Sequence, residues 1–486
     1  MNERPVEVLY DLEEMPPLRE AIPLGLQHVL VMVASNVTIP IIIAGVVGAT
    51  TGETAFLVQV ALLVAGITTL LQTIGIGPVG ARLPVVQGTS FGFLVIAIPL
   101  ASEYGLSAVF GGAIFAGIVQ VILGVSLRWL KSIFPPLVSG IVVLVIGIGL
   151  LPAGVNLAGG GADAPDFGSP SNLMLAGLVL LTILVAYALG KGIISAAAVL
   201  IGLVVGYLVA LPMGAVDTTE IVEAAWFSFP RPLEFGLSFP AAAVIGMSIM
   251  AIATSVETIG DLAAITKGGA GREVTDKELS GGVLGDGVGT AFASLFSAMP
   301  NTSFSQNVGL VAFTGVMSRH VVSIGAGFLI LAGLVPKVAA VIAAMPSAVL
   351  GGAAVVMFAM VAAAGVRLLA ESRLDRRDLL IIAVSVGVGQ GIVAAPDIVA
   401  GVTEQLRVLL ETGIVPAGFL AVVLNLVLPG RDVGTDSPLG ATIAPDAGGS
   451  PGARERREGE LATDASGTRQ EPSTEDRDDE PDPPAR

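Results

Sequence analysis

Long apolar runs dominate this chain and constrain its fold more than any other feature. Among them are "VLVMVASNVTIPIIIAGVV", "GGAIFAGIVQVILGVSL", "LVSGIVVLVIGIGLLPAGV" and "MLAGLVLLTILVAYALG". A helix needs roughly 20 mostly apolar residues to cross the hydrocarbon core of a bilayer. Because 53% of the 486 residues are hydrophobic and only 13% are charged, the sequence predicts an all-α polytopic membrane protein.

The apolar pattern places fourteen membrane spans along the chain. We expect them at residues 24–46, 55–76, 84–101, 105–127, 134–154, 171–190, 192–212, 240–266, 282–298, 301–317, 321–344, 347–367, 378–398 and 413–429.

The distribution of basic residues tests this count, because short cytoplasmic loops collect Lys and Arg. If the N-terminus is cytoplasmic, the inner connections and span ends hold Arg82, Arg128, Lys131, Lys191, Lys267, Arg272, Lys277, Arg319, Arg367, Arg373, Arg376 and Arg377. The outer connections hold only Arg231, Lys337 and Arg407. The asymmetry predicts that both termini are cytoplasmic.

The two ends of the chain differ from the apolar region between them. Residues 1–20 are acidic and lack the basic start of a secretory signal, so we expect a cytoplasmic N-terminal segment followed by a retained first span. Residues 431–486 are rich in Pro, Gly and acidic residues, which predicts a disordered acidic cytoplasmic tail. Residues 21–430 form the predicted transmembrane domain.

The chain contains no Cys and two His. Disulfides, thiolate catalysis and Cys-based metal sites are therefore excluded, and we expect neither a metal nor a cofactor. An intramembrane enzyme has no support either, because no nucleophile, base and orienting group occur together.

Two of the predicted spans are short, open with a proline and carry polar residues at their starts. The tripeptide Thr89-Ser90-Phe91 follows Pro84, and Thr302-Ser303-Phe304 follows Pro300. The two stretches lie about half of the apolar region apart, in the third and tenth spans, which predicts two halves of seven spans each. Because seven is an odd number, the two halves would be inverted in the membrane. Paired, interrupted hydrophobic segments at corresponding positions are the best sequence indication of a transporter binding site.

The polar stretch "PNTSFSQNVGL" has a physical use at this depth. Irregular backbone inside a membrane is tolerated only where protein or a water-filled cavity satisfies its polar groups. A half-helix that begins near Ser305 would direct free N–H groups into such a cavity. Gln306 offers one acceptor and two donors, which suit the lactam edge of a heterocyclic base. The alternative is that these residues only join neighbouring helices.

Four other polar side chains lie within apolar spans. Glu257 and Asp261 are four residues apart, hence on one helical face, and two close carboxyl groups in an apolar place favour protonation of one of them. This pair is a candidate proton carrier, although Asp261 could instead cap or pair. Asp286 could be a plain helix cap, and His28, beside Gln27, could be a buried His with a satisfied partner.

At this point the residues resemble the nucleobase-ascorbate transporters, also called xanthine/uracil permeases. Gln306, Asn307, Gly309, Thr314 and Gly315 fill every position of that family's signature in the tenth span. The pair Gln27-His28, the pair Glu257 and Asp261, and Asp286-Gly287 are similar to further family features.

The resemblance implies a fold of two inverted seven-span repeats, with short strands in spans three and ten that meet at the substrate. A core domain of spans 1–4 and 8–11 would move against a gate domain of spans 5–7 and 12–14, commonly in a homodimer. Implied substrate-binding residues are Glu257, Gln306, Ser90, Phe91 and Ser305, with support from Asn307, Gly309, Thr314, Gln27 and His28. Proton coupling would fall to Glu257, Asp261 and Asp286.

The resemblance also narrows the substrate. Uracil permeases carry Glu at the Gln306 position and His at the Asp261 position, whereas this chain is similar to the xanthine and uric acid carriers. We therefore expect proton symport of an oxidised purine by alternating access in the plasma membrane. Uracil, sodium coupling, and a sulfate or bicarbonate transporter of the same architecture stay open as alternatives, while nucleic acid is not an expected partner. A channel would need a continuous polar lining, and the sequence contains only two short polar stretches.

Overall fold

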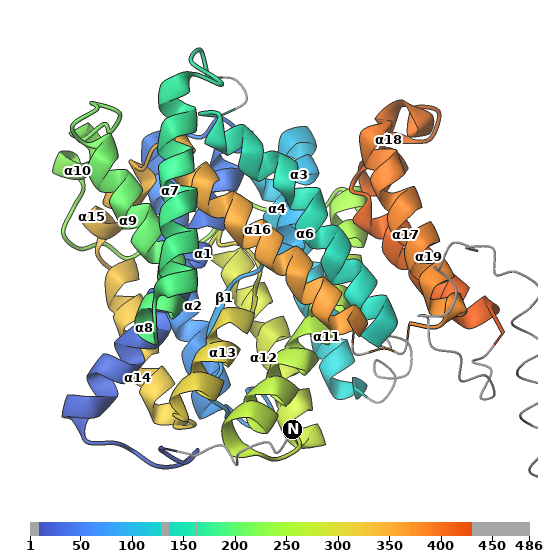
Figure 1. Ribbon diagram of the computed structural model, residues 1–486, viewed down its shortest axis with the longest axis horizontal. Coiled ribbons are helices and arrows are strands. Elements are labelled where there is room, and N and C mark those ends of the chain that lie inside the picture. Colours follow the sequence, from blue (N-terminus) through green and yellow to red (C-terminus); the bar gives the residue numbers. More distant parts are fainter. Residues whose placement is uncertain (1–8, 128–135, 162–163, 371, 373, 430–486) are drawn as a thin grey trace, which may run out of the picture. The chain divides into compact units, whose positions relative to one another are not determined.

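The computed structural model describes residues 9–127, 136–161, 164–370, 372 and 374–429. The predicted acidic tail at 431–486 lies outside the described residues, as do residues 1–8, Arg128, Lys131 and Arg373. The described part is mostly helical, as predicted (Figure 1).

The first half contains α1 (Leu18–Val46), α2 (Thr51–Ile74), β1 (Gln87–Thr89), α3 (Phe91–Tyr104), α4 (Leu106–Val125), α6 (Pro136–Ala158), α7 (Pro170–Leu189), α8 (Ile193–Ala196), α9 (Ala198–Ala210) and α10 (Thr219–Glu223). The second half contains α11 (Ala241–Ala270), α12 (Asp276–Leu295), β2 (Asn301–Ser303), α13 (Ser305–Thr314), α14 (Arg319–Gly333), α15 (Pro336–Ala343), α16 (Ser347–Ala370), α17 (Arg376–Ala394), η1 (Pro396–Val399), α18 (Glu404–Glu411) and α19 (Ile414–Val427).

Within the described ranges, eight helices are long and apolar enough to cross a membrane, or up to ten if each of two bent pairs forms one span. The first bent pair, α14 and α15, turns by 80°. Val335 between them is extended and precedes Pro336, which disfavours helix at the preceding residue. The second pair, α18 and α19, turns by 79°. The length and composition of these helices support a multi-pass membrane protein, and the count of fourteen spans stays a prediction.

Helices α6 and α16 pack closely because glycine removes side chains from their contact (Figure 1). A Cβ atom at Gly147 would lie 2.2 Å from the backbone nitrogen of Ala362, and one at Gly365 would lie 2.3 Å from that of Leu144. Small residues allow such approach between membrane helices, where van der Waals contact drives association.

The N-terminal segment of residues 9–17, here called the N-terminal strap, packs on the connection between α13 and α14. Tyr10 forms a parallel bridge with Val316, and the Met317 amide donates to the Tyr10 carbonyl at 2.9 Å. The Tyr10 phenol donates to Glu20, and this hydrogen bond raises the pKa of Tyr10. The strap therefore joins the start of α1 to the connection between α13 and α14.

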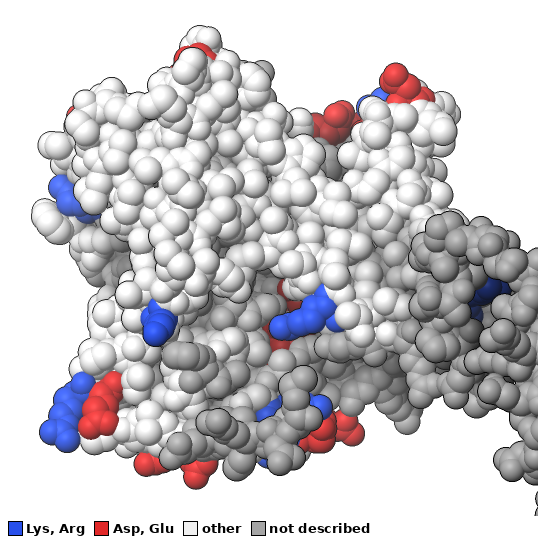
Figure 2. Space-filling view, viewed as in Figure 1, with Lys and Arg blue, Asp and Glu red and all other residues white. Residues whose placement is uncertain are grey.

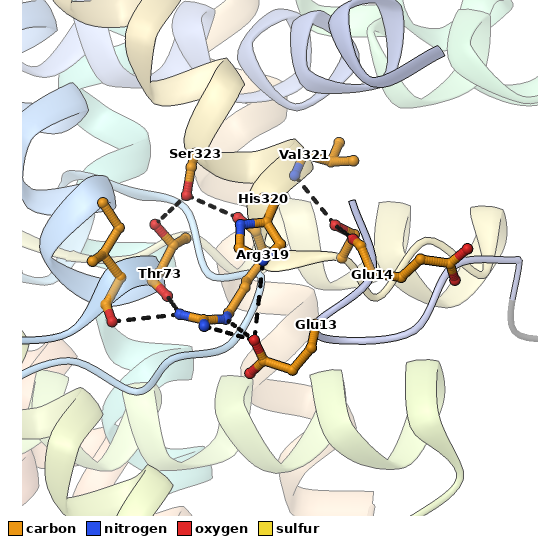
Figure 3. Close-up of polar contacts among 9 residues, drawn as sticks. Glu13, Glu14, Thr73, Arg319, His320, Val321 and Ser323 are labelled. Carbon is orange, nitrogen blue, oxygen red and sulfur yellow. Dashed lines mark hydrogen bonds and ion pairs between the residues drawn. The ribbon is translucent and has the colours of Figure 1, made fainter. Parts of the chain in front are cut away.

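Arg319 connects the strap to a second helix. Figure 3 shows its guanidinium between Glu13, at 2.6 Å, and the Thr73 carbonyl near the C-terminus of α2, at 2.9 Å. Ser323 extends this contact by donating to the Thr73 hydroxyl at 2.8 Å. A cation at the last carbonyls of a helix satisfies acceptors that lack an intrahelical donor.

Candidate substrate site

The two interrupted segments meet at a two-stranded antiparallel sheet. In it Gln87 faces Ser303, Gly88 faces Thr302 and Thr89 faces Asn301. Two more hydrogen bonds flank the strands, from the Ser90 amide to the Pro300 carbonyl at 3.0 Å and from the Phe304 amide to the Val86 carbonyl at 2.9 Å. The irregular backbone thus finds its partners inside the protein, as a membrane interior requires.

Gly88 allows the two segments to approach. A Cβ atom there would lie 2.6 Å from the Phe304 ring, 2.8 Å from the Met32 methyl group and 2.9 Å from the Asn36 side-chain oxygen. That same oxygen accepts a hydrogen bond from the Thr89 amide at 2.8 Å. Helix α1 therefore fixes the position of β1 from behind.

A half-helix begins directly after each strand: α3 at Phe91 and α13 at Ser305. The first N–H groups of a helix have no intrahelical acceptor and form its positive end. A cavity of about 350 Å³ lies between the two helix starts, lined by Ser90, Phe91, Ser305, Gln306, Glu257 and Arg367 among others. This volume is in the range of small-ligand sites.

Five predicted substrate residues therefore lie around one cavity. Ser305 donates to a Glu257 carboxylate oxygen at 3.4 Å, which connects the start of α13 to the middle of α11. Within the described residues the Gln306 side chain has no hydrogen-bond partner, so its amide is available to a ligand.

Asp286 does not line the cavity and is buried behind the strands. It accepts hydrogen bonds from Gln87 at 2.7 Å, from Gln72 at 3.0 Å and from the Thr258 hydroxyl. Asp286 is not a helix cap, because it lies in the middle of α12, whose N-cap is Thr275. Asp286 therefore connects α12 to β1, α2 and α11.

A chain of hydroxyl groups connects Asp286 to Asp261. The Ser303 hydroxyl donates to Asp261 at 2.6 Å and lies 3.1 Å from the Thr258 hydroxyl, which in turn contacts Asp286. Neither Asp261 nor Asp286 lines the cavity, and Ser303 of β2 connects the two carboxyl groups through the Thr258 hydroxyl.

Asn307 lies in the first turn of α13, not on an extended segment. Its side-chain NH₂ group contacts the His28 ring at 3.1 Å and donates to the His28 carbonyl at 3.0 Å. Successive helical residues are about 100° apart, so Gln306 and Asn307 point in different directions although they are neighbours in the sequence. The structure still separates them: Gln306 lines the cavity, and Asn307 is buried against α1.

The other predicted supporting residues are spread along the same helices. Gln27 is half-buried and lines neither this cavity nor the wider one described below. Gly309 lines the wider cavity, and a Cβ atom there would meet nothing within 4 Å. Thr314 bonds the Leu310 carbonyl at 2.8 Å, and Gly315 ends α13 with a φ of 66°.

Two residues that the sequence analysis did not select also line the cavity, Tyr187 of α7 and Arg367 of α16. Arg367 was interpreted only as a cytoplasmic basic residue at the end of a span. A second cavity, of about 1200 Å³, shares Tyr187, Arg367, Ser305 and Gln306 with the first. The two cavities therefore adjoin, and Arg367 lies where they meet.

Comparison with known proteins identifies the family of this chain. A model described as "Permease family", of the xanthine/uracil permease type, matches residues 19–398. The fold and the site define the class as a multi-pass membrane transporter. The chain belongs to the nucleobase-ascorbate transporter family, as its signature residues predict.

Curated relatives cover most of the chain. The xanthine permease of Bacillus subtilis is 40% identical over 84% of this chain and 93% of its own. The uric acid transporter UacT of Escherichia coli is 39% identical over 84% of this chain and 86% of its own. These names support a transport role and not an enzymatic one.

Two solved structures share the fold of this chain at a much lower sequence identity than the curated relatives. The transmembrane domain of the cyanobacterial bicarbonate transporter BicA matches with a TM-score of 0.51 and 14% identity over 86% of this chain and all of that one. SLC26A9 matches with a TM-score of 0.58 and 15% identity over 85% of this chain and 66% of that one.

Proposed function

We propose that the protein takes up an oxidised purine, xanthine or uric acid, by proton symport with alternating access. The observation that carries this proposal is the placement of Glu257 and Gln306 on one cavity of about 350 Å³ between the starts of α3 and α13. A carboxylate can accept from two N–H groups on one edge of a purine, and a side-chain amide can pair with a lactam edge. The names of the two curated relatives described above support this substrate class, since one is a xanthine permease and the other a uric acid transporter.

In this proposal Glu257 is the proton carrier. Moving an ionised carboxylate through the low-dielectric part of the membrane costs several kcal/mol, so a proton taken up with the substrate allows the loaded site to cross. Asp261 and Asp286 act from behind β2, through the hydroxyl groups of Ser303 and Thr258. This arrangement favours a structural and proton-tuning role for them over substrate contact.

The moving parts follow the predicted division of fourteen spans in two inverted repeats. We propose a core domain of spans 1–4 and 8–11, which holds both strands and Glu257, and a gate domain of spans 5–7 and 12–14. The gate would contribute Tyr187 and Arg367 to the cavity. We also propose a plasma-membrane homodimer with both termini cytoplasmic.

Uptake into proteoliposomes tests the proposal. Labelled xanthine, uric acid, uracil and sulfate are offered with and without an imposed proton gradient, and with sodium as a separate arm. Accumulation of xanthine or uric acid driven by the proton gradient is the expected result. Preference for uracil or sulfate, or dependence on sodium alone, would contradict it.

A further inference from the structure

The wider cavity beside the substrate site carries positive side-chain charge. Among its described lining residues the charged ones are Lys191 and Arg367, and no Asp or Glu is among them. Figure 2 shows basic side chains at the rim of a hollow near the middle of this face, with acidic side chains inside it, on a surface that is otherwise mostly uncharged. The hollow lies over α13, between α7 with α8 and the end of α16 (Figure 1).

Three other cations at the ends of helices have partners in the structure. Arg319 is paired with Glu13, Arg377 donates to the Asn425 carbonyl, and Lys337 lies over the Trp226 ring.

Within the described residues, by contrast, neither Lys191 nor Arg367 makes a hydrogen bond or an ion pair. Arg367 interacts electrostatically with Asp261, whose carboxyl group is hydrogen-bonded to Ser303 at 2.6 Å, but within the described residues the two side chains form no ion pair. A cation in a membrane protein is costly unless it faces water, a partner or a ligand. Both side chains therefore have donors available to a ligand in the cavity.

The position of Arg367 limits what can use those donors. Because Arg367 lines both cavities, a ligand that passes from one to the other passes this residue. Guanidinium is planar and matches a planar anion that offers two adjacent acceptors. An oxidised purine that has lost a ring N–H proton is such an anion, with its charge spread over a ring nitrogen and the adjacent carbonyl oxygen.

We propose that the wider cavity is a vestibule that attracts the monoanion of an oxidised purine through Lys191 and Arg367, before or after it occupies the substrate cavity. This inference rests on the proposed function. The vestibule gives the anionic form an advantage over the uncharged form. Glu257 lines the substrate cavity but not the vestibule. Its carboxylate repels the same anion unless it carries a proton.

Equilibrium binding to the purified full-length protein in detergent tests the vestibule. Labelled uric acid and xanthine are compared at one pH between their first N–H ionisations, where uric acid is a monoanion and xanthine is uncharged. In Lys191→Gln, which changes a residue that lines only the wider cavity, we expect uric acid to bind roughly five- to tenfold more weakly, while xanthine affinity changes less than about twofold. In Arg367→Gln we expect a clearly larger loss for uric acid than for xanthine. Arg367→Lys, which keeps the charge, should retain most of the preference.

Lys267→Gln is the matched control, because it removes the same charge from a residue that lines neither cavity. It should leave both affinities unchanged. Equal weakening of both ligands in the cavity variants, or the same uric acid loss in Lys267→Gln, would overturn the vestibule. If Arg367→Gln does not fold, Lys191→Gln decides the question alone. A parent protein that binds neither ligand would overturn the proposed function together with the inference, whereas normal binding with no charge preference would overturn the inference only.

Discussion

Glu257 and Gln306 reach the same cavity from helices of different kinds. Helix α11 is continuous past Glu257, whereas α13 begins one residue before Gln306. The carboxyl group is thus held by a long helix, and the amide lies at the positive end of a short one. Substitutions at these two positions should therefore change different properties of transport.

Gln306→Glu should weaken oxidised-purine binding and shift preference toward uracil. The new carboxylate loses the two amide donors that suit a purine carbonyl and keeps only acceptors. We expect a loss of roughly 1–2 kcal/mol for xanthine, measured as competition between xanthine and uracil for uptake. Unchanged relative rates would show that Gln306 does not contact the base.

Glu257→Gln separates exchange from accumulation. The amide can still hydrogen-bond a purine, with a loss of roughly 1–2 kcal/mol, but it cannot carry a proton. The variant should exchange labelled for unlabelled purine across proteoliposomes and should not concentrate it under a proton gradient. Concentration by the variant would assign coupling to another site.

Asn307→Ala should lower turnover more than affinity, because Asn307 bonds His28 and does not line the substrate cavity. Losing a buried hydrogen-bond partner costs about 1–3 kcal/mol, so thermal stability should fall as well. The double variant with His28→Ala should lose less than the sum of the single changes. A selective rise in the dissociation constant at normal turnover would instead place Asn307 on the ligand.

At the scale of elements, the contact between α6 and α16 offers a matched pair of positions two residues apart. A Cβ atom at Gly147 would lie 2.2 Å from backbone, whereas the closest atom to one at Gly149 is 4.0 Å away. The first glycine is required by close approach of the helices, and the second is not.

Gly147→Ala should therefore destabilise the protein by about 1–3 kcal/mol through overpacking. Gly149→Ala should be neutral or stabilising by up to about 1 kcal/mol, since alanine favours helix. The midpoint temperatures of thermal unfolding in detergent, measured for both variants and for the parent protein, give the order of their stabilities. Equal effects of the two changes would mean that α6 and α16 do not pack as closely as the structure has them.

Some elements were predictable from sequence and others were not, for physical reasons. The Thr-Ser-Phe repeats predicted two interrupted segments, because polar residues and proline inside apolar runs have few other uses. The bend before Pro336 was missed, since apolar content continues through it at residues 321–344. Arg367 was missed because a basic residue at the end of a span also fits the positive-inside rule, and only packing shows that it faces a cavity. The hydrogen bonds of Ser303 and Thr258 to Asp261 and Asp286 could not be predicted, because they depend on where β2 packs in three dimensions.

At the scale of the whole molecule, orientation in the membrane rests on the basic residues. Lys267, Arg272 and Lys277 follow one predicted span, and the loop before that span, with Glu223, is poor in Lys and Arg. Lys267, Arg272 and Lys277 therefore lie on the predicted cytoplasmic side. The sequence contains no Cys, so a single introduced thiol can report the side on which it lies.

Two exposed acidic positions give opposite expectations. Glu223→Cys should react with a membrane-impermeant maleimide in intact cells, and Glu273→Cys should react only after permeabilisation. The parent chain, which has no thiol, is the control. The reverse labelling pattern would show that the orientation in the membrane is opposite to the predicted one. Labelling of both positions from the same side would show that an even number of spans separates them.

The strand pair also affects how the chain is made. β1 and β2 are separated by roughly 200 residues, which at about 5–20 residues per second means a delay of roughly 10–40 s during synthesis. Throughout that interval β1 lacks its partner, and unpaired backbone is not stable against lipid tails. We therefore expect the first spans to stay beside the insertion machinery until the ribosome has delivered the second half, so release of this protein into the bilayer is late and nearly simultaneous for both halves.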